Sequence, residues 1–216
     1  MTEPGFLLST RASYDAVAAA YAGRFHDELA AKPVERAMLG AFAELVPSAE
    51  PVADIGCGTG HVTARLRDLG LSAFGIDLSS QMVALARRQH PGLRFDEGSM
   101  TALDLPDRTL GGILAMYSII HIPREHLPQV FAEFHRVLVP GGRALLVFQV
   151  GDAHERRTEA FGQSISLDCY WRSLEHVAES LGRAGFAEDA RLLREPDEHE
   201  KLQRGFLLVR RPADVV

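Results

Sequence analysis

A loop with three alternating glycines constrains this chain more than any other feature. Residues 52–55 are apolar except for Asp54. They are followed by Gly56, Gly58 and Gly60, and a helical pattern begins directly after the last glycine. This order predicts a buried strand, a tight loop and a helix. Glycine accepts positive φ and has no Cβ, so the loop backbone can lie directly against a ligand. We therefore expect a ligand site at the carboxyl end of this strand, where open α/β sheets bind their ligands.

Two other glycine motifs fit this loop less well. The dinucleotide fingerprint G-x-G-x-x-G needs its third glycine where this sequence has His61 or, counted from Gly58, Thr63. A phosphate-binding P-loop ends in Gly-Lys-Ser/Thr, and the loop contains no lysine. The pattern that fits is D-x-G-x-G-x-G over residues 54–60, and it resembles the first motif of class I S-adenosylmethionine (AdoMet)-dependent methyltransferases. A glycine turn with a purely structural role is the alternative.

Composition limits the classes of protein to consider. A chain of 216 residues with 46% apolar and 24% charged residues is long enough for one large globular domain. Its net charge of −6 argues against a nucleic-acid partner, which would need clustered Lys and Arg. Cys57 and Cys169 lie far apart and give no disulfide framework. Because there is also no signal peptide or long apolar run, we expect a cytoplasmic protein without a membrane partner.

Two amphipathic helices are predicted before the first strand, over residues 10–25 and 33–46, and residues 1–10 are predicted to be frayed. They are not needed to build the sheet, so we expect a helical lid over residues 1–50 and a core over residues 51–216. Tyr14-Asp15-x-x-Ala18-x-x-Tyr21 resembles the lid helix of small-molecule methyltransferases, in which a tyrosine reaches the cofactor. Two core tyrosines on an apolar stripe are the alternative.

Periodicity and turn residues predict the remaining elements. Strands are expected over residues 71–76, 93–97, 109–116 and 143–148, helices over 61–69, 79–89, 125–138 and 173–182, and a terminal hairpin near 187–193 and 204–210. Residues 136–142 resemble the R-x-L-x-P-G-G turn before the family's fifth strand. The resemblance implies a doubly wound, Rossmann-like α/β fold whose seven-stranded sheet is mostly parallel, with an antiparallel last strand.

Three further residues match positions that bind a nucleoside. Asp77 follows Gly60 by seventeen residues and ends the second predicted strand, where a carboxylate accepts hydrogen bonds from both ribose hydroxyls. A carboxylate at this position can bind the ribose of either AdoMet or NAD, so Asp77 does not distinguish the two cofactors. Its alternative role is to cap the next helix. Ser99 stands where the family has an acid for the adenine amino group, and Met100 where a backbone amide reads a ring nitrogen.

The resemblance implies AdoMet as the cofactor and S-adenosylhomocysteine as the product. The cofactor-binding residues that it implies are Tyr14, Tyr21, Asp54, Gly56, Cys57, Gly58, Gly60, Asp77, Leu78, Met82, Ser99, Met100 and Met116. After Met116 the chain has neither the Asn/Asp-Pro-Pro motif of amino-methylating DNA enzymes nor the aspartate of metal-dependent catechol-type enzymes. Neither His154 nor His199 starts the zinc motif H-E-x-x-H, so no metal is predicted.

Candidate catalytic and substrate residues follow the fourth strand. His121 lies five residues beyond it, and a neutral histidine suits a general base; a helix-cap or core role is its alternative. Residues 151–172 are expected to form an irregular polar loop above the same sheet edge, the substrate insert, with His154 as a second candidate base. Substrate contacts are predicted for Tyr117, Arg156, Arg157, Tyr170 and Trp171. A solvated loop with one anchored aromatic is the alternative.

The leading functional hypothesis is methyl transfer from AdoMet to an oxygen or nitrogen of a small molecule. The protein would align the nucleophile with the methyl group and the sulfur, and would exclude water. A methyltransferase that acts on proteins, a non-catalytic AdoMet-binding module and, with less support, an NAD-dependent oxidoreductase are the alternatives.

Overall fold

A seven-stranded sheet runs through the molecule, whose computed structural model describes residues 3–25, 28–47 and 49–214. The strand order is β3-β2-β1-β4-β5-β9-β8. The strands are β1 (Val52–Ile55), β2 (Ala73–Asp77), β3 (Phe95–Glu97), β4 (Leu110–Met116), β5 (Leu138–Gln149), β8 (Ala187–Arg194) and β9 (Arg204–Arg210). The first five pair in parallel, and β9 is antiparallel to both of its neighbours. The predicted fold class is confirmed.

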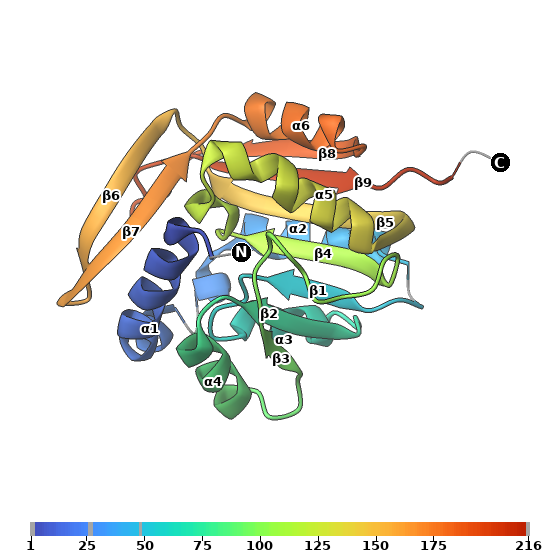
Figure 1. Ribbon diagram of the computed structural model, residues 1–216. Helices are drawn as coiled ribbons and strands as arrows, with labels where there is room; N and C mark the ends of the chain where they lie inside the picture. Colours follow the sequence, from blue (N-terminus) through green and yellow to red (C-terminus); the bar gives the residue numbers. More distant parts are fainter. Residues whose placement is uncertain (1–2, 26–27, 48, 215–216) are drawn as a thin grey trace.

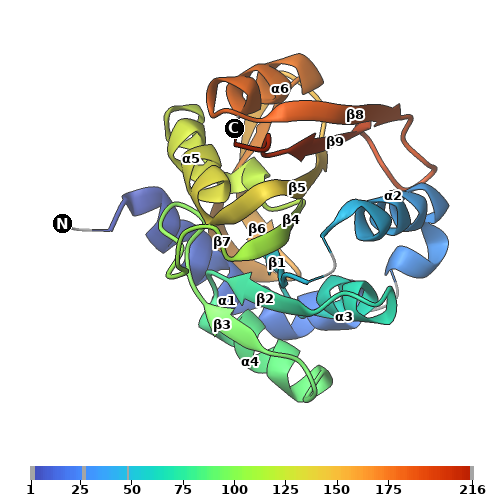
Figure 2. The ribbon, with the colours of Figure 1, turned by 90° about the vertical axis from the view of Figure 1, so that its right-hand side faces the viewer.

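Helices cover both faces of this sheet (Figures 1 and 2). One face packs against α2 (Pro33–Leu45) and α3 (His61–Asp68), and the other against α5 (Leu127–Val137) and α6 (Leu174–Arg183). Ile113 of β4 belongs to the core under α5, whereas its neighbour Leu114 belongs to the core under α2. Because successive side chains alternate between faces, a strand covered on both sides is apolar throughout. Within the described residues, no helix is long and apolar enough to cross a membrane.

Two further α-helices are α4 and the N-terminal α1. α4 (Ser80–Gln89) packs on Phe95 of β3. α1 (Gly5–Phe25) begins about five residues earlier than the pattern predicted, so residues 5–9 are helical and not frayed. Pro4 explains the early start, because its carbonyl accepts a hydrogen bond from the Leu7 amide at 3.0 Å. α1 lies at the carboxyl end of the parallel strands (Figure 1).

The segment predicted as an irregular loop is a regular hairpin. β6 (Ala153–Ala160) and β7 (Gln163–Trp171) pair antiparallel outside the main sheet, and the hairpin projects beside α1 (Figure 1). Phe161 and Gly162 form the turn with φ of 52° and 73°. Two positive φ values match the right-handed twist of paired strands. The charged composition of the strands concealed the pairing, because both faces of β6 are exposed.

Boundaries elsewhere agree with the predictions to within a few residues, apart from the Pro-Gly-Gly turn. β5 already starts at Leu138, so this turn is a bulge inside the strand and not a connection before it. Its pairing with β4 jumps from Leu110–Leu138 to Gly112–Arg143. The bulge thus absorbs the extra residues while the strand continues.

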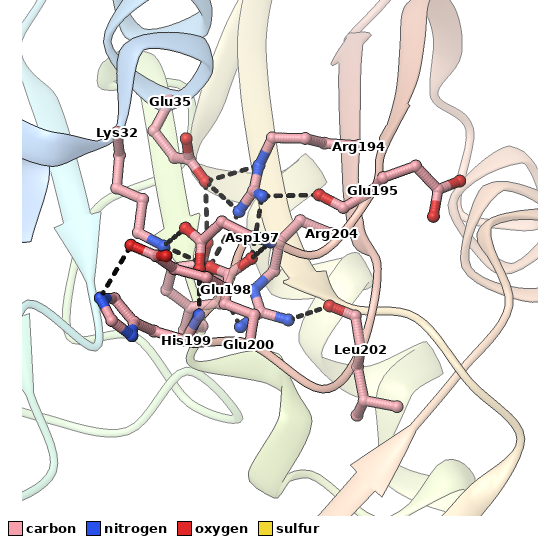
Figure 3. A network of polar contacts seen from close by, with 11 residues as sticks. Lys32, Glu35, Arg194, Glu195, Asp197, Glu198, His199, Glu200, Leu202 and Arg204 are labelled. Atoms are coloured by element: carbon pink, nitrogen blue, oxygen red, sulfur yellow. Dashed lines mark hydrogen bonds and ion pairs between the residues drawn. The ribbon is translucent and has the colours of Figure 1, made fainter.

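An ionic network joins α2 to the β8–β9 hairpin on one side of the molecule (Figure 3). Arg194 of β8 donates to Oε1 of Glu35 on α2 at 2.7 Å and to Glu200 at 2.9 Å. Lys32, just before α2, pairs with Glu200 and Asp197. Glu35 is only 1% exposed, so its ion pair with Arg194 is buried on the Glu35 side. Removal of either partner would leave the other charge without its counterion.

Candidate functional site

A cavity opens where β1, β2 and β4 end, beneath α1. Predicted site residues that line it are Tyr14, Tyr21, Asp54, Gly56, Cys57, Gly58, Asp77, Leu78, Met82, Ser99, Met100, Met116, Tyr117 and His121. Lining residues that the sequence reasoning missed are Phe6, Leu7, Thr10, Glu28, Leu29, Ile55, His61, Val62, Gly98, Ser118 and Ile122. The first turns of α1 supply three of these, and the prediction of frayed residues there concealed them.

The glycine loop has the backbone conformation that its sequence predicted. Gly56, Gly58 and Gly60 have φ of 81°, 53° and 84°, a region that other residues rarely adopt. A Cβ on Gly56 would lie 2.3 Å from the Cβ of Ser118. A Cβ on Gly58 would meet only the Tyr21 ring, at 3.8 Å, so this glycine faces open space. Gly60 instead packs against Phe95, which explains why it does not line the cavity.

Asp77 links the glycine loop to the start of α4. Its Oδ2 accepts a hydrogen bond from the Gly58 amide at 2.7 Å, and its Oδ1 accepts from the Ser79 amide at 2.9 Å. The helix itself is capped by the Ser79 hydroxyl, which accepts from the Met82 amide. Burial raises the pKa of Asp77 to about 6, although both amides oppose the shift. A carboxylate has about four acceptor positions, so two remain for a ligand that donates hydrogen bonds.

Asp54 is a second buried acid in the cavity wall. The Thr63 hydroxyl donates to its Oδ2 at 2.7 Å. Burial raises the pKa of Asp54 to about 7, and this hydrogen bond opposes the shift. Thr63 lies in the first turn of α3, so the bond also fixes the direction in which that helix leaves the loop.

Tyr14 and His121 meet across the cavity. The Tyr14 hydroxyl lies 2.7 Å from His121 Nε2, and His121 Nδ1 lies 2.9 Å from the backbone carbonyl oxygen of Asp168. A carbonyl only accepts, so Nδ1 carries the imidazole proton and Nε2 accepts from Tyr14. Burial lowers the pKa of His121 to about 4, and burial raises that of Tyr14 well above its usual range. Both groups are therefore neutral near pH 7.

The turn that carries His121 is held by a buried arginine. η2 (Ile119–His121) is a single 3-10 turn after β4. Arg172, which follows β7, donates to the carbonyl oxygens of Ile119, Ile122 and Tyr170. Burial lowers the pKa of its guanidinium to about 10. No sequence motif singled out Arg172, because its three partners are backbone atoms.

Polar contacts fasten α1 over the cavity. The carboxylate of Asp15 accepts hydrogen bonds from the Ser79 hydroxyl at 2.5 Å and from the Gln81 amide at 3.2 Å. Arg11 donates to the carbonyl oxygen of Leu78 at 3.2 Å. Two residues of α1 thus hold the β2–α4 connection, which contains the Asp77 site.

The predicted insert residues lie on the hairpin, outside the cavity lining. His154 and Arg156 both contact the Asp168 carboxylate, at 2.7 and 2.8 Å, and lower the pKa of that carboxyl, Arg156 more strongly. The other three form ring contacts: Tyr170 stacks on His154, and Arg157 lies over Trp171. None of these five residues borders the cavity, so the substrate contacts of four of them and the role of His154 as a base remain predictions. Across the described ranges, no three His, Cys, Asp or Glu side chains gather to hold a metal ion.

Comparisons with known proteins agree with this architecture. A methyltransferase-domain family matches residues 52–142. The chain is 35% identical over 97 residues to a demethylmenaquinone methyltransferase of Chlorobaculum tepidum, covering 44% of this chain and 39% of that protein. It is 37% identical over 92 residues to a malonyl-[acyl-carrier protein] O-methyltransferase of Pectobacterium atrosepticum, covering 42% of this chain and 35% of that protein. The match therefore spans about two fifths of these relatives' lengths.

Solved structures extend the likeness to nearly the whole chain. A DhpI–SAH complex superposes with a TM-score of 0.73 at 21% identity, covering 98% of this chain and 99% of that one. Sheet order, glycine loop and family match together define a class I AdoMet-dependent methyltransferase fold, which confirms the resemblance inferred from sequence. Residues 52–142 match the methyltransferase-domain family, and this match, with the SAH complex among the similar structures, supports AdoMet as the cofactor.

Proposed function

We propose that this chain transfers a methyl group from AdoMet to an oxygen or nitrogen of a small molecule. The observation that carries the proposal is one continuous cavity. It contains the glycine loop and Asp77 together with His121, and α1 forms its cover. The similar proteins include a demethylmenaquinone methyltransferase and a malonyl-[acyl-carrier protein] O-methyltransferase, and the first supports a small-molecule acceptor.

The residues of the cavity fit AdoMet. Asp77 keeps acceptor positions for two ribose hydroxyls. Gly58 leaves open space in the cavity, which any larger side chain at this position would fill. In this proposal Ser99 and Met100 bind the adenine, and the Gly56 carbonyl accepts from the methionine ammonium group. Bound AdoMet supplies an electrophilic methyl group on a positive sulfur. The rings of Tyr14, Tyr21 and Tyr117 would surround that charge.

Residues 1–50 act in this proposal as the lid, residues 51–216 as the core, and residues 151–172 as an insert beside the acceptor. Closing α1 over the cavity would exclude water from the reacting atoms. A cytoplasmic location and the absence of a nucleic-acid partner rest on composition alone and are part of the same proposal.

Replacing Asp77 by asparagine is expected to weaken AdoMet binding about 10- to 100-fold, because a charge-assisted hydrogen bond contributes about 1.5–3 kcal/mol. Titration calorimetry with AdoMet measures the change. Asp107→Asn is the matched control. That carboxyl is exposed and pairs with Arg136, and neither residue lines the cavity. Equal affinity of Asp77→Asn and wild type would contradict the ribose assignment.

AdoMet affinity is also expected to rise with pH between about 5 and 7. The ionised Asp77 accepts hydrogen bonds from a ribose, whereas the protonated form loses part of that capacity. With a pKa of about 6, the fraction ionised grows through this window and saturates above it. Affinity measured in Asp77→Asn should lack the rise. A flat wild-type profile would show that the ligand does not depend on this carboxylate.

Transfer itself is tested with AdoMet carrying a labelled methyl group, added with the protein to a host lysate that is then separated by size. Label in the low-mass fraction supports the proposal. Label on macromolecules would favour protein methylation, and binding without label would favour a non-catalytic AdoMet-binding module.

A further inference from the structure

Tyr14 and His121 present a proton acceptor, and not a donor, to the cavity. The imidazole proton on Nδ1 is committed to the Asp168 carbonyl, and the Tyr14 proton is committed to Nε2. Only the lone pairs of the Tyr14 oxygen remain for a ligand. A ligand group that meets this oxygen must therefore donate a hydrogen bond.

The base nitrogen of His121 is also covered. Tyr14 occupies Nε2 at 2.7 Å, and its ring stands nearly perpendicular to the imidazole at 5.3 Å between centroids. A proton from a ligand can reach Nε2 only through the Tyr14 hydroxyl while this contact holds. Tyr14 is thus placed between the acceptor and the base.

We propose that Tyr14 is a catalytic residue that passes the proton of the methyl acceptor to His121, and that the acceptor group is a hydroxyl. This inference rests on the proposed function. The acceptor oxygen forms a bond to the methyl carbon while the carbon–sulfur bond breaks, and its electron pair stays on sulfur. The acceptor's proton moves to the Tyr14 oxygen, and the Tyr14 proton moves to Nε2.

Charge balance favours this route. The sulfonium loses its positive charge in the same step in which the imidazole gains one, so the buried site keeps its net charge. His121 is a weak base, since burial lowers its pKa to about 4. It still suffices, because an oxygen that is becoming methylated is a far stronger acid than an imidazolium. No strong base is required, because the proton leaves as the new bond forms and the oxygen becomes acidic.

The same reasoning selects a hydroxyl over an alkylamine. A methylated alkylamine keeps its proton near pH 7, as the pKa of about 10 for a lysine ammonium shows. The same acceptor also enters as its ammonium form and must lose one proton before it can attack, and His121, with a pKa of about 4, is too weak a base to take that proton. An ether or ester product cannot keep the proton, so a hydroxyl acceptor needs the relay.

The hairpin fixes the imidazole in the required tautomer. The Asp168 carboxylate is held on the outer side by His154 and Arg156, and its backbone carbonyl faces His121. The other groups that face the imidazole are Cys169, with Sγ 4.0 Å from Nδ1, and the positive charges of Arg157 and Arg172. Both charges disfavour an imidazolium, so His121 is neutral in the resting state and its Nε2 lone pair is available.

The test compares Tyr14→Phe, His121→Gln and the double variant in the labelled-methyl assay with the low-mass fraction of the host lysate. Each single change should lower the rate about 10²- to 10³-fold. The double variant should lose no more, because residues that act as one unit are not additive. His199→Gln, an exposed histidine, is the matched control and should keep the wild-type rate. Mass spectrometry should find the label on oxygen.

Three results would overturn the relay: Tyr14→Phe within about threefold of wild type, independent losses that multiply in the double variant, or label on nitrogen. Calorimetry with AdoMet distinguishes the relay from a role in cofactor binding. The relay predicts that both single variants bind AdoMet within about threefold of the wild-type affinity.

Failure of the proposed function is recognised separately. If the wild type transfers no label at all, nitrogen-15 NMR of the ligand-free protein still decides the pair. The relay requires Nε2 to be the unprotonated nitrogen of His121 and its resonance to shift in Tyr14→Phe. A proton on Nε2, or no shift in that variant, overturns the relay regardless of activity.

Discussion

Replacing Gly56 by alanine is expected to lower the free energy of unfolding by about 2–5 kcal/mol, the sum of the left-handed backbone penalty and a core clash. The added Cβ would lie 2.3 Å from the Ser118 Cβ, and neither atom is the end of a flexible side chain. Ser118 is itself held, because its hydroxyl donates to the Ile55 carbonyl oxygen at 2.8 Å. The loop must move, and the proposed AdoMet site moves with it.

A matched control separates strain from clash. Gly70 has φ of 92°, and a Cβ there would meet nothing within 4 Å. Gly70→Ala should therefore show the backbone penalty alone, about 1–2 kcal/mol. Denaturant unfolding gives both free energies, and calorimetry with AdoMet gives binding, which only the Gly56 variant should lose. Equal costs for the two variants would mean that Ser118 does not restrict the loop.

Sequence reasoning predicted the parts of the site that local backbone rules dictate. The glycine loop and the acid at the end of β2 follow from φ preferences and strand ends, and both lie where they were expected. Asp77 illustrates the limit of this reasoning. Its position was predictable, but its hydrogen bond to the Gly58 amide depends on how two loops pack.

Contacts between distant segments could not be read from the sequence. Tyr14 and His121 were each predicted as site residues, yet 107 positions separate them and no pattern couples them. Arg172 acts through backbone carbonyls, which every sequence supplies equally. The β6–β7 hairpin was missed because strand prediction relies on one apolar face, whereas β6 has none.

Removing the side chain of Arg194 is the other change with a large expected effect. Arg194→Met should lower the free energy of unfolding by about 3–5 kcal/mol, because Glu35 would remain buried without a charged partner. Oε1 of Glu35 would keep only the Tyr117 hydroxyl, at 3.4 Å. Tyr117 lines the cavity, so the same change should also loosen that wall.

The chain offers a matched control on the same strand. Arg191 pairs with Glu188 in an exposed setting, so Arg191→Met should cost less than about 1 kcal/mol. The double variant Arg194→Met with Glu35→Leu should regain most of the lost stability, since an apolar pair replaces a buried ion pair at little cost. Denaturant midpoints at constant slope measure all three. If Arg194→Met proves no more costly than Arg191→Met, Glu35 is not held by this pair. α2 would then be attached to the β8–β9 hairpin by Lys32 and its two acids.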